Sequence, residues 1–515
     1  MSTLKTGLSL APIFSDNMIL QRDKEFKVWG KSTETYPIMI TLGAEQVTVY
    51  PVEGRWQAVL PPMKAAESEE MTIYSVGSSE KIVVKNVAIG EVWIAGGQSN
   101  MEWFLRWDAE ASKSIASANH PLIRYYETPK ITYEGQDRDE DFSDSGFWRL
   151  CDPKDAPFFS AVGYYFAHEL YNSLNVPIGI VGCNYGGSSA STWLEETYLE
   201  NDEDLRSYLR DYEENKNKLS PDEYEAKFKK QRSMLTHPET NAFMEKLNSG
   251  ELEHGEQVSK PADDEMEEFI SLYSIMGPKS FNRPSGLYHT MVKTIAGYAS
   301  RGVIWYQGES DVNKADIYDK LFASMIRCWR ETWDDELLFF FVQLAPFTAN
   351  QSSFDKMYPI IRQRQEQVSK TVPNAYMASI MDAGMEFDIH PRRKRPVGER
   401  LALLTRGKVY GENIICESPE VRHAVRKDLS VTVELNHVGT GLKLEGHTLN
   451  GLQVFIRDEE ITDFNAEIGK DVLSITSEKF DQASRVQIRY AWKDYVEVNL
   501  YSSVGLPVKP FMIEI

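Results

Sequence analysis

The sequence contains few cysteines, and their arrangement excludes some classes of site. Only four of the 515 residues are cysteine, and no two of them form a Cys-x-x-Cys pair. A zinc knot or a redox motif is therefore not expected. Scattered cysteines of this kind are typical of buried free thiols in a reducing compartment. They are Cys151, Cys183, Cys328 and Cys416.

Basic residues and long apolar runs are also scarce. Lysine and arginine number 56 against 77 acidic residues, which gives a net charge of −21. This charge argues against nucleic-acid partners and against binding to anionic membranes. No apolar run approaches a membrane span, and residues 1–7 lack the apolar core of a signal peptide. We expect a cytoplasmic protein, unless a leader has been removed, and the sequence makes no prediction about its oligomeric state.

A chain of this length needs more than one core, and the pattern changes twice along it. Residues 1–88 and 412–515 contain short strand-like runs separated by turns, which predict an N-terminal and a C-terminal β-sandwich. The expected strands are 38–42, 46–50, 56–60, 71–76 and 81–84 in the first region, and 429–435, 452–456, 472–476 and 485–492 in the last.

Residues 89–411 instead alternate strands with amphipathic helices, which predicts a parallel sheet covered by helices on both faces. The expected strands are 92–95, 176–183, 302–306, 337–344 and 376–381, and the expected helices include 162–170, 287–295, 316–333 and 355–371. A charged segment, 195–280, interrupts the alternation. It is either a solvated helical insertion, whose Ser220 opens a capping box before Pro221, or a lid over a cleft.

A catalytic nucleophile is expected where the strand 92–95 ends. Gly96 and Gly97 permit backbone angles that a side chain would forbid, and Ser99 then opens a helix. This places one hydroxyl beside unpaired backbone N–H groups, as an acyl-transfer nucleophile requires. The alternative is that Ser99 is only a helix N-cap. Met101 replaces the last glycine of a Gly-x-Ser-x-Gly motif, which argues against the α/β-hydrolase elbow.

A serine nucleophile needs a base, and His390 follows the last expected strand of the sheet. It therefore reaches the same sheet edge as the serine, since ligand sites in such sheets lie beyond the carboxyl ends of the strands. An acidic residue should orient the imidazole. Asp388 is the nearest candidate, and Glu386 and Asp382 are alternatives.

Two further strand ends offer donors to an oxyanion. Gln307 follows the strand 302–306 and carries a side-chain amide. Gly186 and Gly187 follow the strand 176–183 and carry backbone N–H groups. Four strand ends with matching chemistry favour a single site.

These residues together resemble the sialate O-acetylesterase family of SGNH hydrolases, over nearly the whole chain. The segments that carry the resemblance are 97–101, 305–310 and 388–391 in the centre, 14–22 and 28–30 near the start, and 489–492, 499–501, 505–507 and 510–511 near the end. The family implies an SGNH-type three-layer α/β/α domain, flanked here by β-sandwiches. It implies a serine esterase that removes O-acetyl groups from sugars through an acetyl-enzyme, without a metal or cofactor.

Carried over by position, the resemblance makes Ser99 the nucleophile and His390 the base. The N–H groups of Ser99 and Gly187, with Gln307, would form the oxyanion hole. Many SGNH enzymes place the acid three residues before the histidine. Here that residue is Phe387, so the acid is either Asp388 or one of its two alternatives. A third possibility is a Ser-His dyad that has no acid and is supported by a backbone carbonyl.

The substrate is less defined by the sequence. Candidate substrate contacts are Glu309, Trp103, and the pair Arg362 and Gln365, which alternatively forms a structural salt bridge. Trp103 and Tyr185 would close the pocket to acyl groups longer than acetyl. The basic run 392–395 is either a solvated helix start or a site for the carboxylate of sialic acid.

Three other functions stay open. The first is an acetylesterase that acts on neutral acetylated xylo- or manno-oligosaccharides. In the second, the protein is a carbohydrate-binding protein with a dead hydrolase core. The third, a lipase or thioesterase, would need a broad apolar groove.

Overall fold

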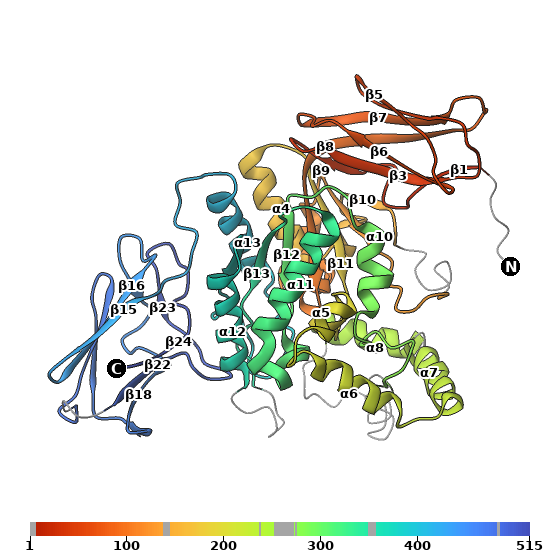
Figure 1. Ribbon diagram of the computed structural model, residues 1–515. Coiled ribbons are helices and arrows are strands. Elements are labelled where there is room, and N and C mark those ends of the chain that lie inside the picture. The colour runs from red at the N-terminus through yellow and green to blue at the C-terminus, as the bar shows by residue number, and fades with distance from the viewer. Residues whose placement is uncertain are drawn as a thin grey trace. The chain divides into compact units, whose positions relative to one another are not determined.

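The structure is a computed structural model that describes residues 7–136, 145–235, 238–251, 272, 275–348, 357–480 and 485–515. The chain forms two compact units. Unit 1 consists of Met1–Trp305 and Ser324–Phe339, and unit 2 of Tyr306–Ala323 and Phe340–Ile515. The fold is mixed α/β, with a central mixed sheet and additional β-sheets (Figure 1). None of the described helices is long and apolar enough to cross a membrane.

Unit 1 begins with β-structure, as predicted. The strands are β1 (Leu8–Leu10), β2 (Ile19–Gln21), β3 (Phe26–Ser32), β4 (Ile38–Leu42), β5 (Glu45–Val49), β6 (Arg55–Leu60) and β7 (Ala66–Ser75). β3 lies between β1 and β6, and β4 lies between β5 and β7. Along β4, buried and partly buried residues alternate, because every second side chain faces the interior.

The next strand, β8 (Lys81–Gly97), differs from the prediction. The sequence indicates two short strands here, but the structure has one strand of 17 residues. Its first part pairs antiparallel with β7, and its last part pairs in parallel with β11 (Ile178–Asn184) from Glu91 to Gly97. The predicted boundary between residues 88 and 89 therefore falls inside a continuous strand.

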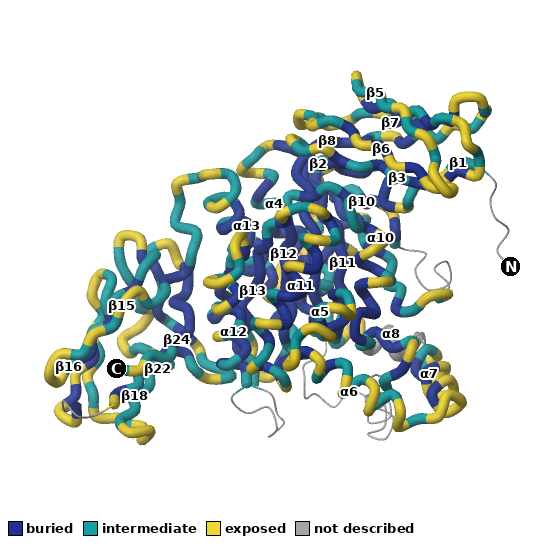
Figure 2. The backbone as a smooth tube through the Cα atoms, in the orientation of Figure 1, coloured by how far each residue is buried: buried dark blue, intermediate teal, exposed yellow. Residues whose placement is uncertain are grey.

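The sheet of unit 1 has the order β10-β9-β11-β8-β12. Its further strands are β9 (His120–Glu127), β10 (Trp148–Cys151) and β12 (Gly302–Tyr306). β9, β11 and β8 run parallel, but β10 is antiparallel to β9, so the expectation of a purely parallel sheet is wrong at this edge. β11 and β12 are buried along their whole length, dark blue in Figure 2, as strands covered on both faces should be.

Helices, most of them short, alternate with the strands of unit 1 from β8 onward. They are α1 (Ser99–Glu102), η1 (Leu105–Trp107), α2 (Ala111–Ala116), η2 (Ala156–Phe158), α4 (Ala161–Leu174), η3 (Ala190–Thr192), η4 (Tyr288–Val292) and α10 (Lys293–Ile295). The predicted helical faces in 162–170 and 287–295 are confirmed, although η4 is a π-helical turn. Ser160 caps α4, because its hydroxyl accepts the N–H of Gly163 at 3.0 Å.

The charged insertion is helical where it is described. Its helices are α5 (Glu196–Glu200), α6 (Arg206–Lys216), α7 (Pro221–Leu235) and α8 (Pro238–Ser249). The predicted capping box is confirmed, since Ser220 N–H donates to Glu223 at 2.8 Å and the Glu223 N–H donates back to Ser220 Oγ at 3.4 Å. Most of the remainder of the insertion lies outside the described residues, and its role as a lid stays a prediction.

Unit 2 contains helices and additional β-sheets. β13 (Leu338–Val342) and α11 (Tyr318–Trp333) each belong partly to both units, and β13 neighbours β14 (Ala375–Ala378). The other helices are η5 (Glu309–Ile317), α12 (Met357–Thr371) and α13 (Arg395–Lys408). The predicted helix 316–333 and the described part of 355–371 are confirmed.

The C-terminal strands form two four-stranded sheets, in the orders β15-β16-β21-β20 and β19-β18-β22-β24, and the pair β17-β23. They are β15 (Glu420–Lys427), β16 (Ser430–Asn436), β17 (Lys443–Leu444), β18 (Leu452–Ile456), β19 (Glu459–Ile461), β20 (Asn465–Ile468), β21 (Val472–Thr476), β22 (Val486–Tyr490), β23 (Leu500–Tyr501) and β24 (Phe511–Glu514). Buried side chains of β16 and β21 share one core with those of β18 and β22, so two sheets enclose it.

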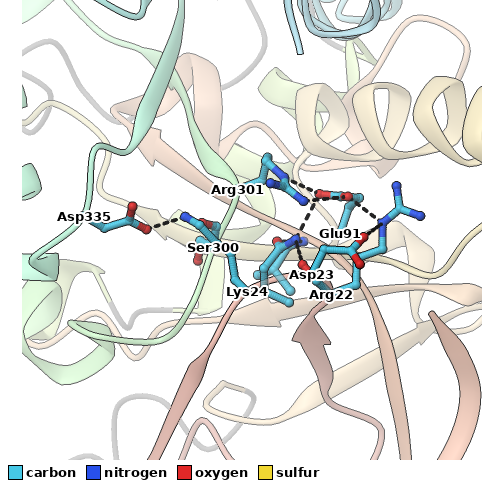
Figure 3. Close-up of polar contacts among 9 residues, drawn as sticks. Arg22, Asp23, Lys24, Glu91, Ser300, Arg301 and Asp335 are labelled. Carbon is cyan, nitrogen blue, oxygen red and sulfur yellow. Dashed lines mark hydrogen bonds and ion pairs between the residues drawn. The ribbon is translucent and has the colours of Figure 1, made fainter. Parts of the chain in front are cut away.

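A buried ion cluster stabilises the middle of β8. Glu91 is fully buried, and its carboxylate accepts hydrogen bonds from Arg22 Nε at 2.7 Å and Arg301 Nε at 2.9 Å, as well as Gln21 Nε2 at 3.1 Å. Figure 3 shows Arg22 and Arg301 converging on Glu91. Burial opposes ionisation of Glu91, but the hydrogen bonds from Arg301 and Arg22 outweigh it and hold its pKa below the usual value. The cluster links two distant segments, around Arg22 and around Arg301, to the strand that leads to Ser99.

All four cysteines are free thiols. Cys151, Cys183 and Cys328 are buried as predicted, whereas Cys416 is only half-buried. Burial raises the pKa of Cys151 to about 12, so this thiol is inert at neutral pH.

Candidate functional site

The two glycines at the end of β8 are required for different reasons. Gly97 has a φ of +133°, a backbone angle that side chains disfavour. A Cβ at Gly96 would lie 2.7 Å from the ring of Trp305, so this position needs glycine for lack of space. The predicted backbone-angle explanation is therefore confirmed for Gly97 and wrong for Gly96.

Ser99 is the first residue of α1, and Gln98 is its N-cap. The alternative that Ser99 is merely an N-cap is therefore wrong. Ser99 is half-buried, between the buried residues Gln98 and Asn100. Because α1 has only four residues, the contribution of a helix dipole is small, and local backbone N–H groups matter more.

A second turn lies beside Ser99, at the end of the neighbouring strand β11. The N–H of Tyr185 donates to Gly97 O at 3.0 Å, which joins the two strand ends. A Cβ at Gly186 would lie 3.6 Å from Ser99 Cβ, so the structure brings the serine and this glycine turn together. The Gly186 N–H donates to Glu102 Oε2 at 2.5 Å.

The two glycines differ in what their backbone N–H groups contact. Gly187 has a φ of +74°, and its N–H donates to no residue in the described part of the chain. Asn282 fixes this turn, since its Nδ2 donates to Gly187 O at 3.1 Å and its Oδ1 accepts the Ser189 N–H at 3.0 Å. Sequence reasoning missed Asn282, because it lies 95 residues from its partner and in no motif.

Gln307 follows β12 in unit 2, as predicted, and is fully buried. Its Nε2 donates to Asp311 Oδ2 at 2.7 Å, and its Oε1 accepts the hydroxyl of Tyr318 at 2.8 Å. These contacts fix the orientation of the amide. Sequence reasoning did not assign a role to Asp311 or Tyr318.

Glu309 lines a narrow hollow in unit 2. Its other walls include Tyr358, Asp388, Ile389 and Pro391. Burial raises the pKa of Tyr306 well above its usual value, and the negative charge of Glu309 adds to the effect. Tyr306 is therefore a neutral phenol.

The three candidate acids differ sharply in their surroundings. Asp388 is 6% exposed, and its Oδ1 accepts the backbone N–H of His390 at 2.8 Å. Asp382 is instead bound by both terminal nitrogens of Arg400, and Glu386 is exposed. The backbone thus holds Asp388 and His390 side by side, with His390 half-buried.

The basic run after His390 is not uniformly solvated. Arg393 is exposed, but Lys394 is fully buried, with its ammonium 5.5 Å from the centroid of the Tyr306 ring. The expectation of a solvated helix start is therefore wrong for Lys394, because an aromatic face can stabilise a buried cation. The helix itself, α13, begins at Arg395.

Arg362 and Gln365 make structural contacts within unit 2. Arg362 is fully buried and donates to the carbonyl oxygens of Leu344, Ala345, Lys493 and Asp494. Gln365 accepts the Leu344 N–H at 2.8 Å and donates to Gln307 O at 3.2 Å. These contacts favour the structural alternative, with backbone carbonyls in place of the expected salt bridge.

Two aromatic residues lie next to the serine and glycine turns. Trp103 is 4% exposed, and its backbone N–H donates to Ser99 O at 2.9 Å. Its ring packs edge-on against Trp107. Tyr185 stacks on Phe281 with ring centroids 5.0 Å apart. Their predicted role in limiting acyl length stays a prediction.

Comparisons with known proteins agree with this chemistry. Residues 274–403 match the family model described as carbohydrate esterase, sialic acid-specific acetylesterase. The sialate O-acetylesterase of Mus musculus is 27% identical over 452 residues, covering 80% of this chain and 76% of that protein. The sialate O-acetylesterase of Homo sapiens is 26% identical over 450 residues, covering 80% and 73%.

One solved structure is similar over almost the full length. It is a carbohydrate acetylesterase from Xanthomonas citri with a TM-score of 0.76 and 27% identity, and the match covers 98% of this chain and 99% of that one. The matched family segment contains Gln307 and His390, and the full-length match extends the likeness to the region of Ser99. Over most of its length the chain is similar to the sialate O-acetylesterases and to a carbohydrate acetylesterase.

Proposed function

We propose that this protein hydrolyses O-acetyl esters of carbohydrates and is a carboxylic ester hydrolase. The observation that carries the proposal is the arrangement at the ends of β8 and β11. There a serine that is not an N-cap lies against a glycine turn whose Gly187 N–H has no partner in the described part of the chain. An ester carbonyl whose carbon lies at Ser99 Oγ would develop its negative charge next to such a donor.

The proposed mechanism is that of a serine esterase. Ser99 Oγ attacks the acetyl carbonyl carbon while His390 accepts the hydroxyl proton, and Asp388 orients the imidazole. The N–H groups of Ser99 and Gly187, together with Gln307, stabilise the oxyanion. The sugar alcohol leaves with the proton from His390. Water activated by His390 then hydrolyses the acetyl-enzyme and releases acetate.

We further propose the finer architecture that the family resemblance implies. The core would be an SGNH-type three-layer α/β/α domain spanning 89–411, between β-sandwiches at 1–88 and 412–515. The alternating burial in the N-terminal strands and the shared core of the two C-terminal sheets support the two sandwiches. The continuity of β8 means that the first boundary would be crossed by a single strand.

For the substrate, the similarity to sialate O-acetylesterases favours an acetylated sialic acid. Neutral acetylated xylo- or manno-oligosaccharides are the second candidate, since the structural neighbour is called a carbohydrate acetylesterase without a named sugar. Glu309 and Trp103 are the proposed substrate contacts. Arg362 is not, because its guanidinium is occupied by backbone carbonyls.

The test is acetate release from a panel of acetylated sialic acid, xylan and mannan fragments. The wild type should release acetate from at least one of them, and Ser99→Ala should reduce this to background. A serine-reactive fluorophosphonate, located by peptide mass spectrometry, should label Ser99. A protein that binds these sugars but neither releases acetate nor reacts with the probe would be a dead hydrolase, and the proposal would be wrong.

A further inference from the structure

Glu102 lies in the stretch around the serine, but the proposed mechanism gives it no role. It is the last residue of α1, one turn after Ser99. Its Oε2 accepts the N–H of Gly186 at 2.5 Å, and that glycine immediately precedes the proposed oxyanion donor Gly187. A Cβ at Gly186 would lie 3.0 Å from Glu102 Oε2 and 3.6 Å from Ser99 Cβ. One carboxylate thus links the serine helix to the glycine turn.

The carboxylate is itself held in place by a partly buried cation. Lys130 Nζ pairs with Glu102 Oε1 and lies 3.7 Å from Glu127 Oε1. The side chains of Lys130 and Glu102 are 15% and 25% exposed. Burial opposes the charge on Lys130, but Glu102 and Glu127 outweigh it and hold the pKa of Lys130 above its usual value. Glu127 in turn accepts the hydroxyl of Tyr125 at 2.5 Å.

From these contacts we infer that Glu102 is a positioning residue, which holds the Gly186–Gly187 turn so that the Gly187 N–H faces the acyl oxygen at Ser99. Lys130 keeps Glu102 on this turn, because without the cation the carboxylates of Glu102 and Glu127 would repel each other. The inference rests on the proposed esterase function of the same site. An oxyanion donor acts mainly in the transition state, so its misplacement lowers kcat and leaves KM nearly unchanged.

Four variants test the inference with 4-nitrophenyl acetate as the substrate. Glu102→Ala removes the acceptor and should lower kcat about 100-fold, as the loss of one oxyanion donor does. Glu102→Gln keeps an acceptor oxygen for the Gly186 N–H and should retain most of the activity. Lys130→Met should lower kcat, and adding Glu102→Gln to it should restore activity, because the repulsion from Glu127 is then removed. The matched control, Glu127→Gln, alters the same cluster without touching the glycine turn and should keep kcat within about twofold.

Thermal unfolding of each variant shows whether it is folded. Recovery of activity by Glu102→Gln in the Lys130→Met background is a second control, because a purely structural loss is not expected to recover in this way. The rate of fluorophosphonate labelling at Ser99 gives a second readout that needs no sugar. If Glu102→Ala keeps both kcat and the labelling rate, or if Glu127→Gln loses as much as Glu102→Ala, the inference is wrong. If the wild type labels normally but releases acetate from no sugar, the proposed function fails, while the labelling rates still test Glu102.

Discussion

Arg400 binds Asp382 with both terminal nitrogens, at 2.6 and 2.7 Å. This bidentate pair occupies both oxygens of one candidate acid. Asp388, in contrast, accepts the backbone N–H of His390 at its Oδ1. The geometry therefore distinguishes Asp388, the nearest candidate in the sequence, from its alternative Asp382.

The first prediction follows from this difference. Asp388→Asn keeps an oxygen for the His390 N–H but removes the charge that stabilises the imidazolium, so kcat should fall by about 10³-fold or more. Asp382→Asn should lower thermal stability and leave kcat nearly unchanged. Steady-state hydrolysis of 4-nitrophenyl acetate with both variants measures this. Full activity in Asp388→Asn would favour the Ser-His dyad.

The second prediction concerns the buried amide of Gln307. Gln307→Ala should lower kcat about 10- to 100-fold with KM unchanged, if the amide stabilises the oxyanion. Tyr318→Phe removes the hydroxyl that Gln307 Oε1 accepts, and should cause a smaller loss in the same direction. Steady-state kinetics test the role of Gln307, with variants whose thermal unfolding transitions show that they are folded. An unchanged kcat in Gln307→Ala would limit its role to holding the turn after β12.

The third prediction concerns stability and pH. Glu91→Gln leaves Arg22 and Arg301 without their carboxylate, and the free energy of unfolding at pH 7 should fall by about 3 kcal/mol. Since the folded-state pKa of Glu91 lies below its usual value of 4.5, its stabilising contribution is complete above that pH. It is lost as the pH falls from 4.5 through the folded-state pKa.

Urea unfolding between pH 3 and pH 7 measures this effect. The difference in stability between wild type and Glu91→Gln should shrink as the pH falls. Glu213→Gln is the control, because Glu213 pairs with Lys216 on the exposed surface of α6 and should change little. A difference that stays constant down to pH 3 would contradict the assigned pKa direction.

The sequence predicted those features that depend on neighbouring residues. The strands 302–306, 452–456 and 472–476 have the predicted limits, because each is a short β-rich run between turns. The requirement for glycine at Gly97 was also predictable, since a strand-to-helix turn needs an unusual backbone angle.

Features that depend on distant residues could not be predicted. Gly90 and Glu91 look like a break in the sequence, yet Glu91 is buried in β8, because its carboxylate meets Arg22 and Arg301. The same holds for Asn282, whose partner Gly187 is 95 residues away. The anchoring of Glu102 by Lys130 requires a contact across 28 residues that no motif indicates. Burial of Lys394 depends on the ring of Tyr306.

The last prediction tests whether Arg362 is structural. Its guanidinium donates to four backbone carbonyls, and a lysine ammonium cannot reach all of them. Buried acceptors without partners cost about 1–3 kcal/mol each, so Arg362→Lys should lower the free energy of unfolding by about 3 kcal/mol. Because no substrate contact is lost, KM for an acetylated sugar should be unchanged in the folded variant. Arg364→Lys, on the same helix and with a 3.9 Å pair to Asp319, is the control and should change neither quantity. A raised KM at unchanged stability in Arg362→Lys would instead assign this arginine to the substrate.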